Sequence, residues 1–175
     1  MLGALALAAW VAATQAASEA PLELVATIAM PGVKGRIDHL AVDVKGRRLF
    51  VAALGYDTVE VLDAAGNLHV RSIPGFGEPQ GVPYLPQSNR LYLANGTANR
   101  IDILDGASLT SVKRIEKVDD ADNVRFDAVA GTVLVGYGKV HCVYCTQIAA
   151  SRPETYHCRA IPSPSTSTQA DSGHS

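Results

Sequence analysis

The feature that most constrains the fold is a segment that occurs twice at a spacing of 42 residues. Residues 46–63 read GRRLFVAALGYDTVEVLD, and residues 88–105 read SNRLYLANGTANRIDILD. A weaker third copy follows at the same spacing, so the chain carries an internal repeat rather than a chance likeness. The apolar positions that coincide in all three copies are Leu40, Val82 and Val124; Val42, Tyr84 and Phe126; Leu49, Leu91 and Val133; Val51, Leu93 and Val135; and Val59, Ile101 and Val143.

Each unit divides into four short runs that favour β-strands. The runs are HLAVD, RLFVAA, TVEVLD and HVRSI in the first unit, and GVPYL, RLYLAN, RIDILD and SVKRI in the second. Glycine, asparagine, aspartate and proline stand between them, as they do in tight turns. We expect Asp63 and Asp105 to accept hydrogen bonds from the backbone of the turn that follows each of them.

The second run of each unit is apolar at successive positions, which indicates a strand buried on both faces. Four such strands per unit, with neighbouring units covering both faces, are typical of a β-propeller blade. The predicted fold class is therefore all-β: an incomplete β-propeller over residues 22–148, with two full four-stranded blades and part of a third. The predicted repeats cover residues 37–78, 79–120 and 121–148.

The repeat fails in the third copy. Gln147 replaces the turn aspartate, and Glu154 and His157 replace apolar positions. Residues 149–175 are rich in Pro, Ser and Thr and are predicted to be a disordered, low-complexity tail. Since a closed ring takes about 4–8 blades, we expect a truncated or frame-shifted reading of a longer protein; self-assembly of partial rings and a short open solenoid are the alternatives. An open stack exposes apolar faces, so we expect self-association.

The first 17 residues predict a secretory signal, because a short apolar run is followed by small residues. Cleavage is expected after Ala13 or Ala16, and a buried core helix is the alternative. Export would place the protein in the periplasm or outside the cell, with no membrane span after signal removal. The formal net charge of −2 offers no basic field for nucleic acid.

The runs GRIDHLAVDVKGRRLFVAALGYDTVEVLD and PQGVPYLPQSNRLYLANG resemble the YVTN-type β-propeller family, which includes YncE-like exported proteins. The resemblance covers about residues 22–145. It implies a propeller fold and a non-catalytic module that binds an unknown protein or small-molecule ligand. The alternative that it implies is part of a lactonase-like metal-dependent hydrolase or of a quinone-dependent dehydrogenase.

Polar residues precede the first strand of every unit at equivalent positions. Because the innermost strand of a blade lines the central channel, these residues are expected at one mouth of that channel. Their carboxylates and amides could bind a ligand or, alternatively, a calcium ion; the simpler alternative is that they cap strand ends in solvent. The candidates are Arg36, Asp38, His39, Glu78, Gln80, Asp120, Asp122 and Asn123.

The cysteines lie in the last third of the chain. Cys142, Cys145, His157 and Cys158 have a spacing that roughly resembles a zinc site. The alternatives are a disulfide between Cys142 and Cys145 or between Cys145 and Cys158, or no role. Thr146 follows Cys145 where c-type haem attachment requires histidine.

Overall fold

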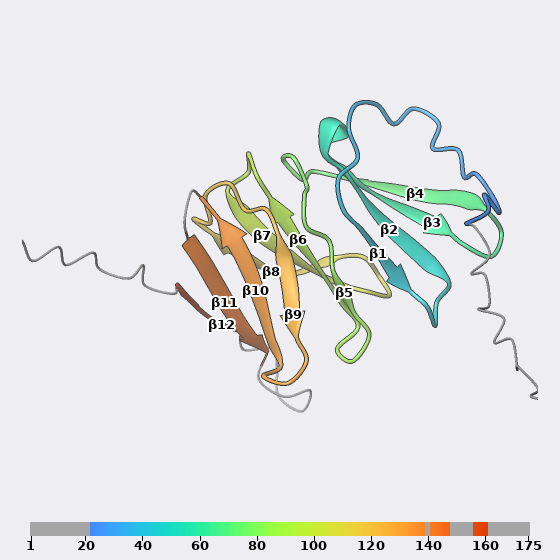
Figure 1. Ribbon diagram of the computed structural model, residues 1–175. Coiled ribbons are helices and arrows are strands. Elements are labelled where there is room, and N and C mark those ends of the chain that lie inside the picture. Colours follow the sequence, from blue (N-terminus) through green and yellow to red (C-terminus); the bar gives the residue numbers. More distant parts are fainter. Residues whose placement is uncertain (1–21, 139–140, 148–155, 161–175) are drawn as a thin grey trace, which may run out of the picture.

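The computed structural model describes residues 22–138, 141–147 and 156–160, and its described part contains three four-stranded antiparallel sheets (Figure 1). A single 3₁₀ turn, η1 (Leu54–Tyr56), follows the second strand. The strands are β1 (Leu40–Asp43), β2 (Arg48–Ala53), β3 (Thr58–Asp63) and β4 (Leu68–Pro74) in the first sheet; β5 (Tyr84–Leu85), β6 (Arg90–Asn95), β7 (Arg100–Asp105) and β8 (Ser111–Glu116) in the second; and β9 (Val124–Asp127), β10 (Thr132–Tyr137), β11 (His141–Gln147) and β12 (Tyr156–Ala160) in the third.

The 42-residue period is reproduced in the strand order of all three sheets and in the register of their first two strands. Every sheet is a simple meander in which consecutive strands are neighbours. Val42 pairs with Leu49 in the first sheet, Tyr84 with Leu91 in the second, and Phe126 with Val133 in the third. The β3–β4 and β7–β8 pairs even share an irregularity at the same place, after Val61 and after Ile103. The predicted equivalence of the first two strands of all three copies is therefore confirmed.

At the third strand the predicted equivalence holds for the first two sheets, where Ala52 pairs with Val59 and Ala94 with Ile101. In the third sheet Gly136 pairs with Cys142, so the predicted equivalence of Val143 with Val59 and Ile101 is wrong: β11 is shifted by one residue against β10.

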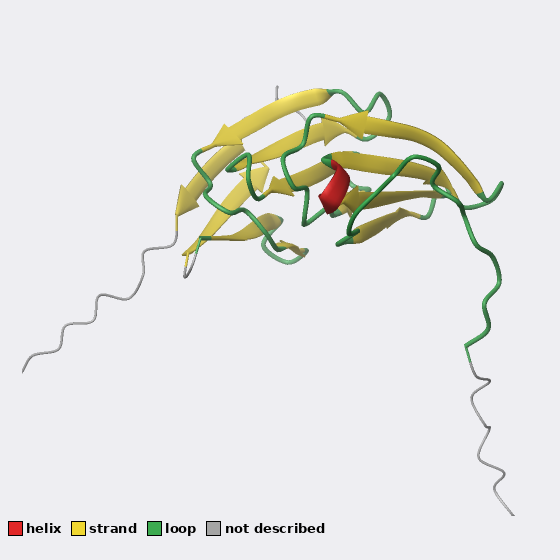
Figure 2. Ribbon diagram, turned by 90° about the horizontal axis from the view of Figure 1, so that it is seen from above, coloured by secondary structure: helices red, strands yellow, loops and turns green. Residues whose placement is uncertain are grey.

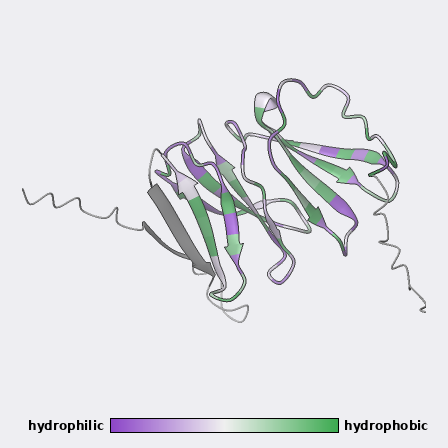
Figure 3. Cartoon of the chain, in the orientation of Figure 1, coloured by the Kyte–Doolittle hydropathy of each residue, from purple (hydrophilic) through white to green (hydrophobic). Residues whose placement is uncertain are grey.

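The core lies between the sheets. We call the face of each sheet that carries Phe50 or its equivalents the forward face, and the opposite face, which carries Leu91 and Leu93 in the second sheet, the rear face. The forward face of the first sheet packs on the rear face of the second, and the forward face of the second packs on the rear face of the third. This two-sided burial explains why β2, β6 and β10 carry apolar residues at successive positions (Figure 3). Viewed from above, the first and third sheets lie at the two ends of an open stack (Figure 2).

The third sheet differs from the sequence expectation at its last strand. Tyr156–Ala160 forms β12 and pairs with β11, although the sequence predicts low-complexity chain from residue 149. The register explains the difference, because Ala160 pairs with Val143 as Ile73 pairs with Val59. A strict 42-residue spacing would put that position at residue 157, so a longer β11–β12 connection moves the strand out of the expected frame. The predicted signal, residues 1–17, and most of the predicted tail lie outside the described residues.

The turns repeat as closely as the strands. The residue before each second strand has a left-handed backbone, with φ of 53° at Arg47, 51° at Asn89 and 63° at Gly131. The turn aspartates behave as predicted: Asp63 Oδ1 accepts a hydrogen bond from Ala65 N at 2.9 Å, and Asp105 Oδ1 accepts one from Ser108 N at 2.9 Å. These backbone hydrogen bonds lower the pKa of both carboxyl groups.

Lowered carboxyl pKa values predict acid sensitivity. A group whose pKa is lower in the folded state stabilises the fold above its unfolded value, 3.8 here, and this contribution is lost as the pH falls through the folded value. The melting temperature should therefore drop below about pH 4, and Asp105→Asn should flatten part of that drop. Thermal melts followed by circular dichroism between neutral and acidic pH measure this. Glu116→Gln, at an exposed carboxylate, is the control; an unchanged Asp105→Asn profile would contradict the assignment.

Candidate functional site

The polar candidates lie where the sequence places them, at the entrance to the first strand of each sheet. Their backbones make equivalent hydrogen bonds in all three sheets. Asp38 N, Gln80 N and Asp122 N donate to the second strand over 2.9, 2.9 and 3.0 Å. The carbonyl oxygens of His39, Gly81 and Asn123 accept from that strand at 2.9 Å in each case. These bonds extend the pairing of the first two strands, so the positions are built into the sheets.

Glu78 and Asp120 are held by the sheet that precedes them. Asp57 Oδ1 accepts a hydrogen bond from Glu78 N at 2.9 Å, and Asn99 Oδ1 accepts one from Asp120 N at 3.0 Å. Glu78 and Asp120 both have left-handed φ values, 48° and 47°. Both residues are exposed. Their backbone hydrogen bonds to Asp57 and Asn99 join consecutive sheets.

Only some of the candidate side chains approach one another. His39 Nδ1 lies 3.5 Å from Asp38 Oδ2. Gln80 and Asp120 converge on Gly96, where an added Cβ would lie 2.5 Å from Gln80 Nε2 and 3.5 Å from Asp120 Oδ1. Arg36, Asp38, Asp122 and Asn123 are exposed. In the described part of the chain no three His, Cys, Asp or Glu side chains gather closely enough to hold a metal ion; a calcium ion at this end stays a prediction.

Sequence reasoning missed two buried carboxylates at equivalent positions of β3 and β7. Asp102 accepts hydrogen bonds from Arg100 Nε and Arg114 Nε, each at 2.8 Å, and from Asn95 Nδ2 at 3.1 Å. Glu60 is fully buried and is bonded instead to Thr58, to His69 and to Ser72. The sequence did contain a signal for these two residues: an acidic residue occurs inside an apolar run, and it recurs 42 residues later.

The group around Glu60 contains the residue types of a hydrolytic triad but not its geometry. Glu60 Oε2 accepts a hydrogen bond from Ser72 Oγ at 2.5 Å and is also hydrogen-bonded to His69 Nε2 at 2.6 Å. A nucleophilic serine must instead pass its proton to the histidine. Because the Ser72 hydroxyl donates to the carboxylate, this arrangement satisfies the hydrogen-bonding capacity of a buried acid and fixes its orientation.

The rear face of the first sheet carries an exposed apolar patch, which we call the β1 patch: Leu40, Val42 and Val44. Leu40 is 61% exposed, whereas the equivalent Val82 and Val124 are 2% and 3% exposed because each packs on the preceding sheet. Val42 is 49% exposed and Val44 is 82% exposed. Positions that pack against the preceding sheet in the second and third sheets are therefore exposed to solvent in the first sheet.

The candidate zinc ligands lie on β11 and β12, and their backbone register separates the sequence alternatives. Cys145 pairs directly with Cys158 across the two strands. Antiparallel Cα partners lie about 4.5–5.5 Å apart, within the range of disulfides. Cys142 precedes Cys145 by three residues of extended strand, about 10 Å, which is too far for a disulfide. The register favours the Cys145–Cys158 pairing.

Comparison with known proteins identifies the architecture. No family model and no curated protein matches this chain. Among solved structures, the chain is similar to one in the crystal structure of the mitotic checkpoint complex, with a TM-score of 0.60 and 17% identity over 74% of this chain and 41% of that one. It is also similar to the hydrazine synthase of Kuenenia stuttgartiensis, with a TM-score of 0.51 and 20% identity over 70% of this chain and 36% of that one. The chain thus spans about two fifths of each. The fold is β-propeller-like, as predicted.

In the described part no helix is long and apolar enough to cross a membrane.

The two buried acids should respond differently to neutralisation. Asp102→Asn leaves the half-buried Arg100 without its counter-charge and leaves Arg114 only the more distant Glu116, 3.8 Å away, so it should cost about 3 kcal/mol. Glu60→Gln leaves mainly neutral partners and should cost about 1 kcal/mol. Urea unfolding of both variants beside the unmodified chain measures the difference. Equal losses would contradict the assignment, since they would show that Arg100 and Arg114 do not depend on the charge of Asp102.

The cysteine register predicts one disulfide and one free thiol. Alkylation without reduction, followed by peptide mass mapping, should find Cys145 joined to Cys158 and Cys142 alkylated. Cys158→Ser should leave both remaining cysteines reactive. Recovery of a Cys142–Cys145 linkage, or of zinc bound to the purified chain, would refute the pairing.

Proposed function

We propose that this protein is an exported, YncE-like propeller module that acts by binding another protein chain, and not by catalysis. The observation that carries the proposal is the β1 patch: the positions that bury Val82 and Val124 between sheets leave Leu40 open to solvent. Exposed apolar surface of this kind is typical of an interaction site. The structure in the mitotic checkpoint complex, to which the chain is similar, belongs to a protein assembly.

The partner that best fits the β1 patch is a second copy of this chain. Within the chain, a forward face packs on a rear face twice, at the same repeat positions each time. The complementarity of two such faces is thus already present in the molecule. A head-to-tail contact, with the third sheet of one copy against the first sheet of the next, would repeat this packing and would build a ring or a filament.

Export is supported by the first 17 residues, whose short apolar run and small flanking residues resemble a cleaved secretory signal. Binding through loops and sheet faces also agrees with the exposed polar ends of the strands, where the candidate side chains remain open to solvent. Of these residues, Arg36, Asp38 and His39 come just before Leu40 in the chain and offer a polar rim beside the apolar patch.

The experiment is sedimentation velocity over a wide range of concentrations. The unmodified chain should form oligomers, and a Leu40→Lys, Val42→Lys double variant should shift to monomer, because burial of each residue contributes about 1.5–3 kcal/mol. Val129→Lys, at a site 99% exposed in the β9–β10 turn, is the matched control and should associate normally. N-terminal sequencing of exported protein should begin at residue 14 or 17.

A monomeric unmodified chain, or a double variant that still associates, would overturn the proposed partner. Circular dichroism spectra of both variants distinguish lost association from lost folding. A double variant that is a folded monomer keeps the β-sheet spectrum, although its melting temperature falls because association no longer stabilises it.

A further inference from the structure

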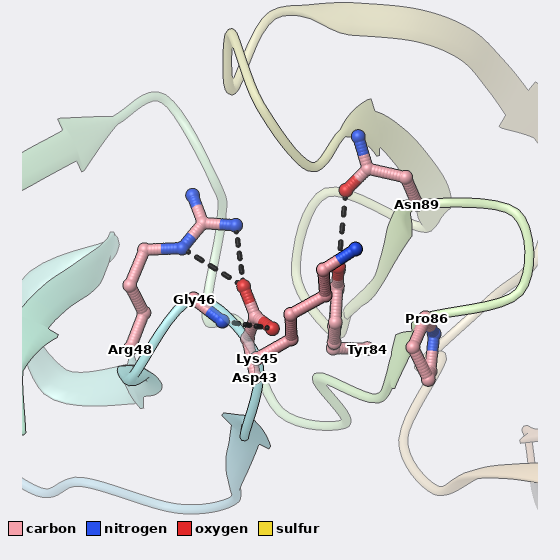
Figure 4. Close-up of a pocket in the computed structure, with 7 residues that line it drawn as sticks. All are labelled: Asp43, Lys45, Gly46, Arg48, Tyr84, Pro86 and Asn89. Atoms are coloured by element: carbon pink, nitrogen blue, oxygen red, sulfur yellow. Dashed lines mark hydrogen bonds and ion pairs between the residues drawn. The ribbon is translucent and has the colours of Figure 1, made fainter.

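A cavity of about 390 Å³ lies between the first two sheets, at the end opposite to the polar candidates (Figure 4). Its walls come from the turn that follows β1 and from the turn that follows β5. That volume is at the lower end of the range for small-molecule sites. The lining residues are Asp43, Lys45, Gly46, Arg48, Tyr84, Pro86 and Asn89.

Most of the wall is held rigid by its own contacts. Asp43 Oδ2 accepts hydrogen bonds from Arg48 Nε at 3.0 Å and from Arg48 Nη2 at 2.7 Å, and Asp43 Oδ1 accepts one from Gly46 N at 2.9 Å. The Arg48 guanidinium also lies over the Phe50 ring, 5.1 Å from its centroid. On the facing turn, the Tyr84 hydroxyl donates to Asn89 Oδ1 at 3.0 Å.

Two glycines provide the space for this arrangement. A Cβ at Gly46 would lie 2.2 Å from Asp43 Oδ2, and a Cβ at Gly106 would lie 2.2 Å from Asn89 Oδ1 and 2.9 Å from the Tyr84 ring. The Arg48–Asp43 pair therefore requires glycine at position 46, and the Tyr84–Asn89 pair requires glycine at position 106. The cavity is thus formed before any ligand arrives, which lowers the entropy cost of binding.

The charges in the cavity leave one cation without a partner. The Asp43 carboxylate is engaged by Arg48 and by the backbone of the turn, whereas Lys45 is exposed and its side-chain ammonium makes no hydrogen bond or ion pair within the described chain. Figure 4 shows its side chain reaching from the β1–β2 turn toward the wall formed by Tyr84 and Asn89. The sum of one carboxylate and two cations is a single positive charge, which suits a monoanion.

The repeat provides an internal comparison. At the equivalent place between the second and third sheets, Leu85 replaces Asp43, Gln87 replaces Lys45, Phe126 replaces Tyr84 and Gly131 replaces Asn89. The fold therefore does not need the carboxylate, the ammonium group, the phenol or the amide at these positions. Their presence in only one of two equivalent grooves points to a ligand.

We propose that this groove, which we call the inter-sheet pocket, binds a small organic carboxylate. The Lys45 ammonium would pair with the carboxylate and the Tyr84 side chain would bound the ligand's body together with the Pro86 ring. An apolar or aromatic body of this size fits a cavity whose facing wall combines a tyrosine ring and a proline ring. The site is separate from the β1 patch in both its residues and its chemistry.

Benzoate is the probe, measured by saturation-transfer difference NMR, which also works on large assemblies. Benzamide, benzylammonium, acetate and inorganic phosphate are the comparison compounds. Benzoate should bind saturably with a dissociation constant in about the millimolar range or tighter. Benzamide and acetate should bind more weakly, which separates the contributions of charge and ring, and benzylammonium should not bind.

The variants are taken from the repeat itself. Lys45→Gln installs the residue found at position 87, and Tyr84→Phe installs the residue found at position 126, so the fold accommodates both. Lys45→Gln should weaken benzoate binding by about tenfold, as expected for about 1.4 kcal/mol, and Tyr84→Phe should weaken it less. Lys113→Gln, on exposed β8, is the matched charge control and should bind normally.

Absence of saturable benzoate binding, equal binding of benzylammonium, or full binding by Lys45→Gln would each overturn the proposal. Preference for phosphate over benzoate would also refute it, since a bare anion site does not need the ring wall.

Discussion

The packing of one sheet face on the next is the interaction on which the rest of this structure depends. Each forward face presents apolar side chains at the same repeat positions, and each rear face receives them at equally regular positions. A meander of four short strands cannot bury both of its faces by itself, so every sheet requires a neighbour. The joints between consecutive sheets at Glu78 and Asp120, and the inter-sheet pocket, are positioned by this stacking.

The fold could be predicted because this packing leaves a periodic trace in the sequence. Residues 42 positions apart occupy the same place in successive sheets, so an apolar residue such as Leu49 has a counterpart in Leu91. The turns add a second periodic trace, because a short aspartate side chain at the end of a strand accepts hydrogen bonds from the backbone of the following turn. Asp63 and Asp105 were identified in this way together with their hydrogen bonds.

The last strand and the functional groups were harder to predict, for different physical reasons. β12 was missed because a longer connection moves Tyr156–Ala160 out of the fixed period, and loop length costs little free energy. The polar candidates were placed correctly on the chain, but alignment within a repeat does not state which side chains meet in space. Lys45 and Tyr84 belong to different sheets and different repeat positions, so a comparison of equivalent residues does not pair them.

Departures from the repeat therefore carry more functional information than the repeat itself. Positions shared by all copies are explained by stacking, and their identity needs no ligand. At the inter-sheet pocket the two grooves have the same backbone frame but different chemistry, Lys45 against Gln87 and Tyr84 against Phe126. At the β1 patch the chemistry is shared but the burial differs, since Leu40 is open and Val82 is covered. The first difference is the basis of the proposed ligand and the second is the basis of the proposed partner chain. A repeat protein thus provides its own control, because one copy shows what folding requires and the next shows what has been added to it.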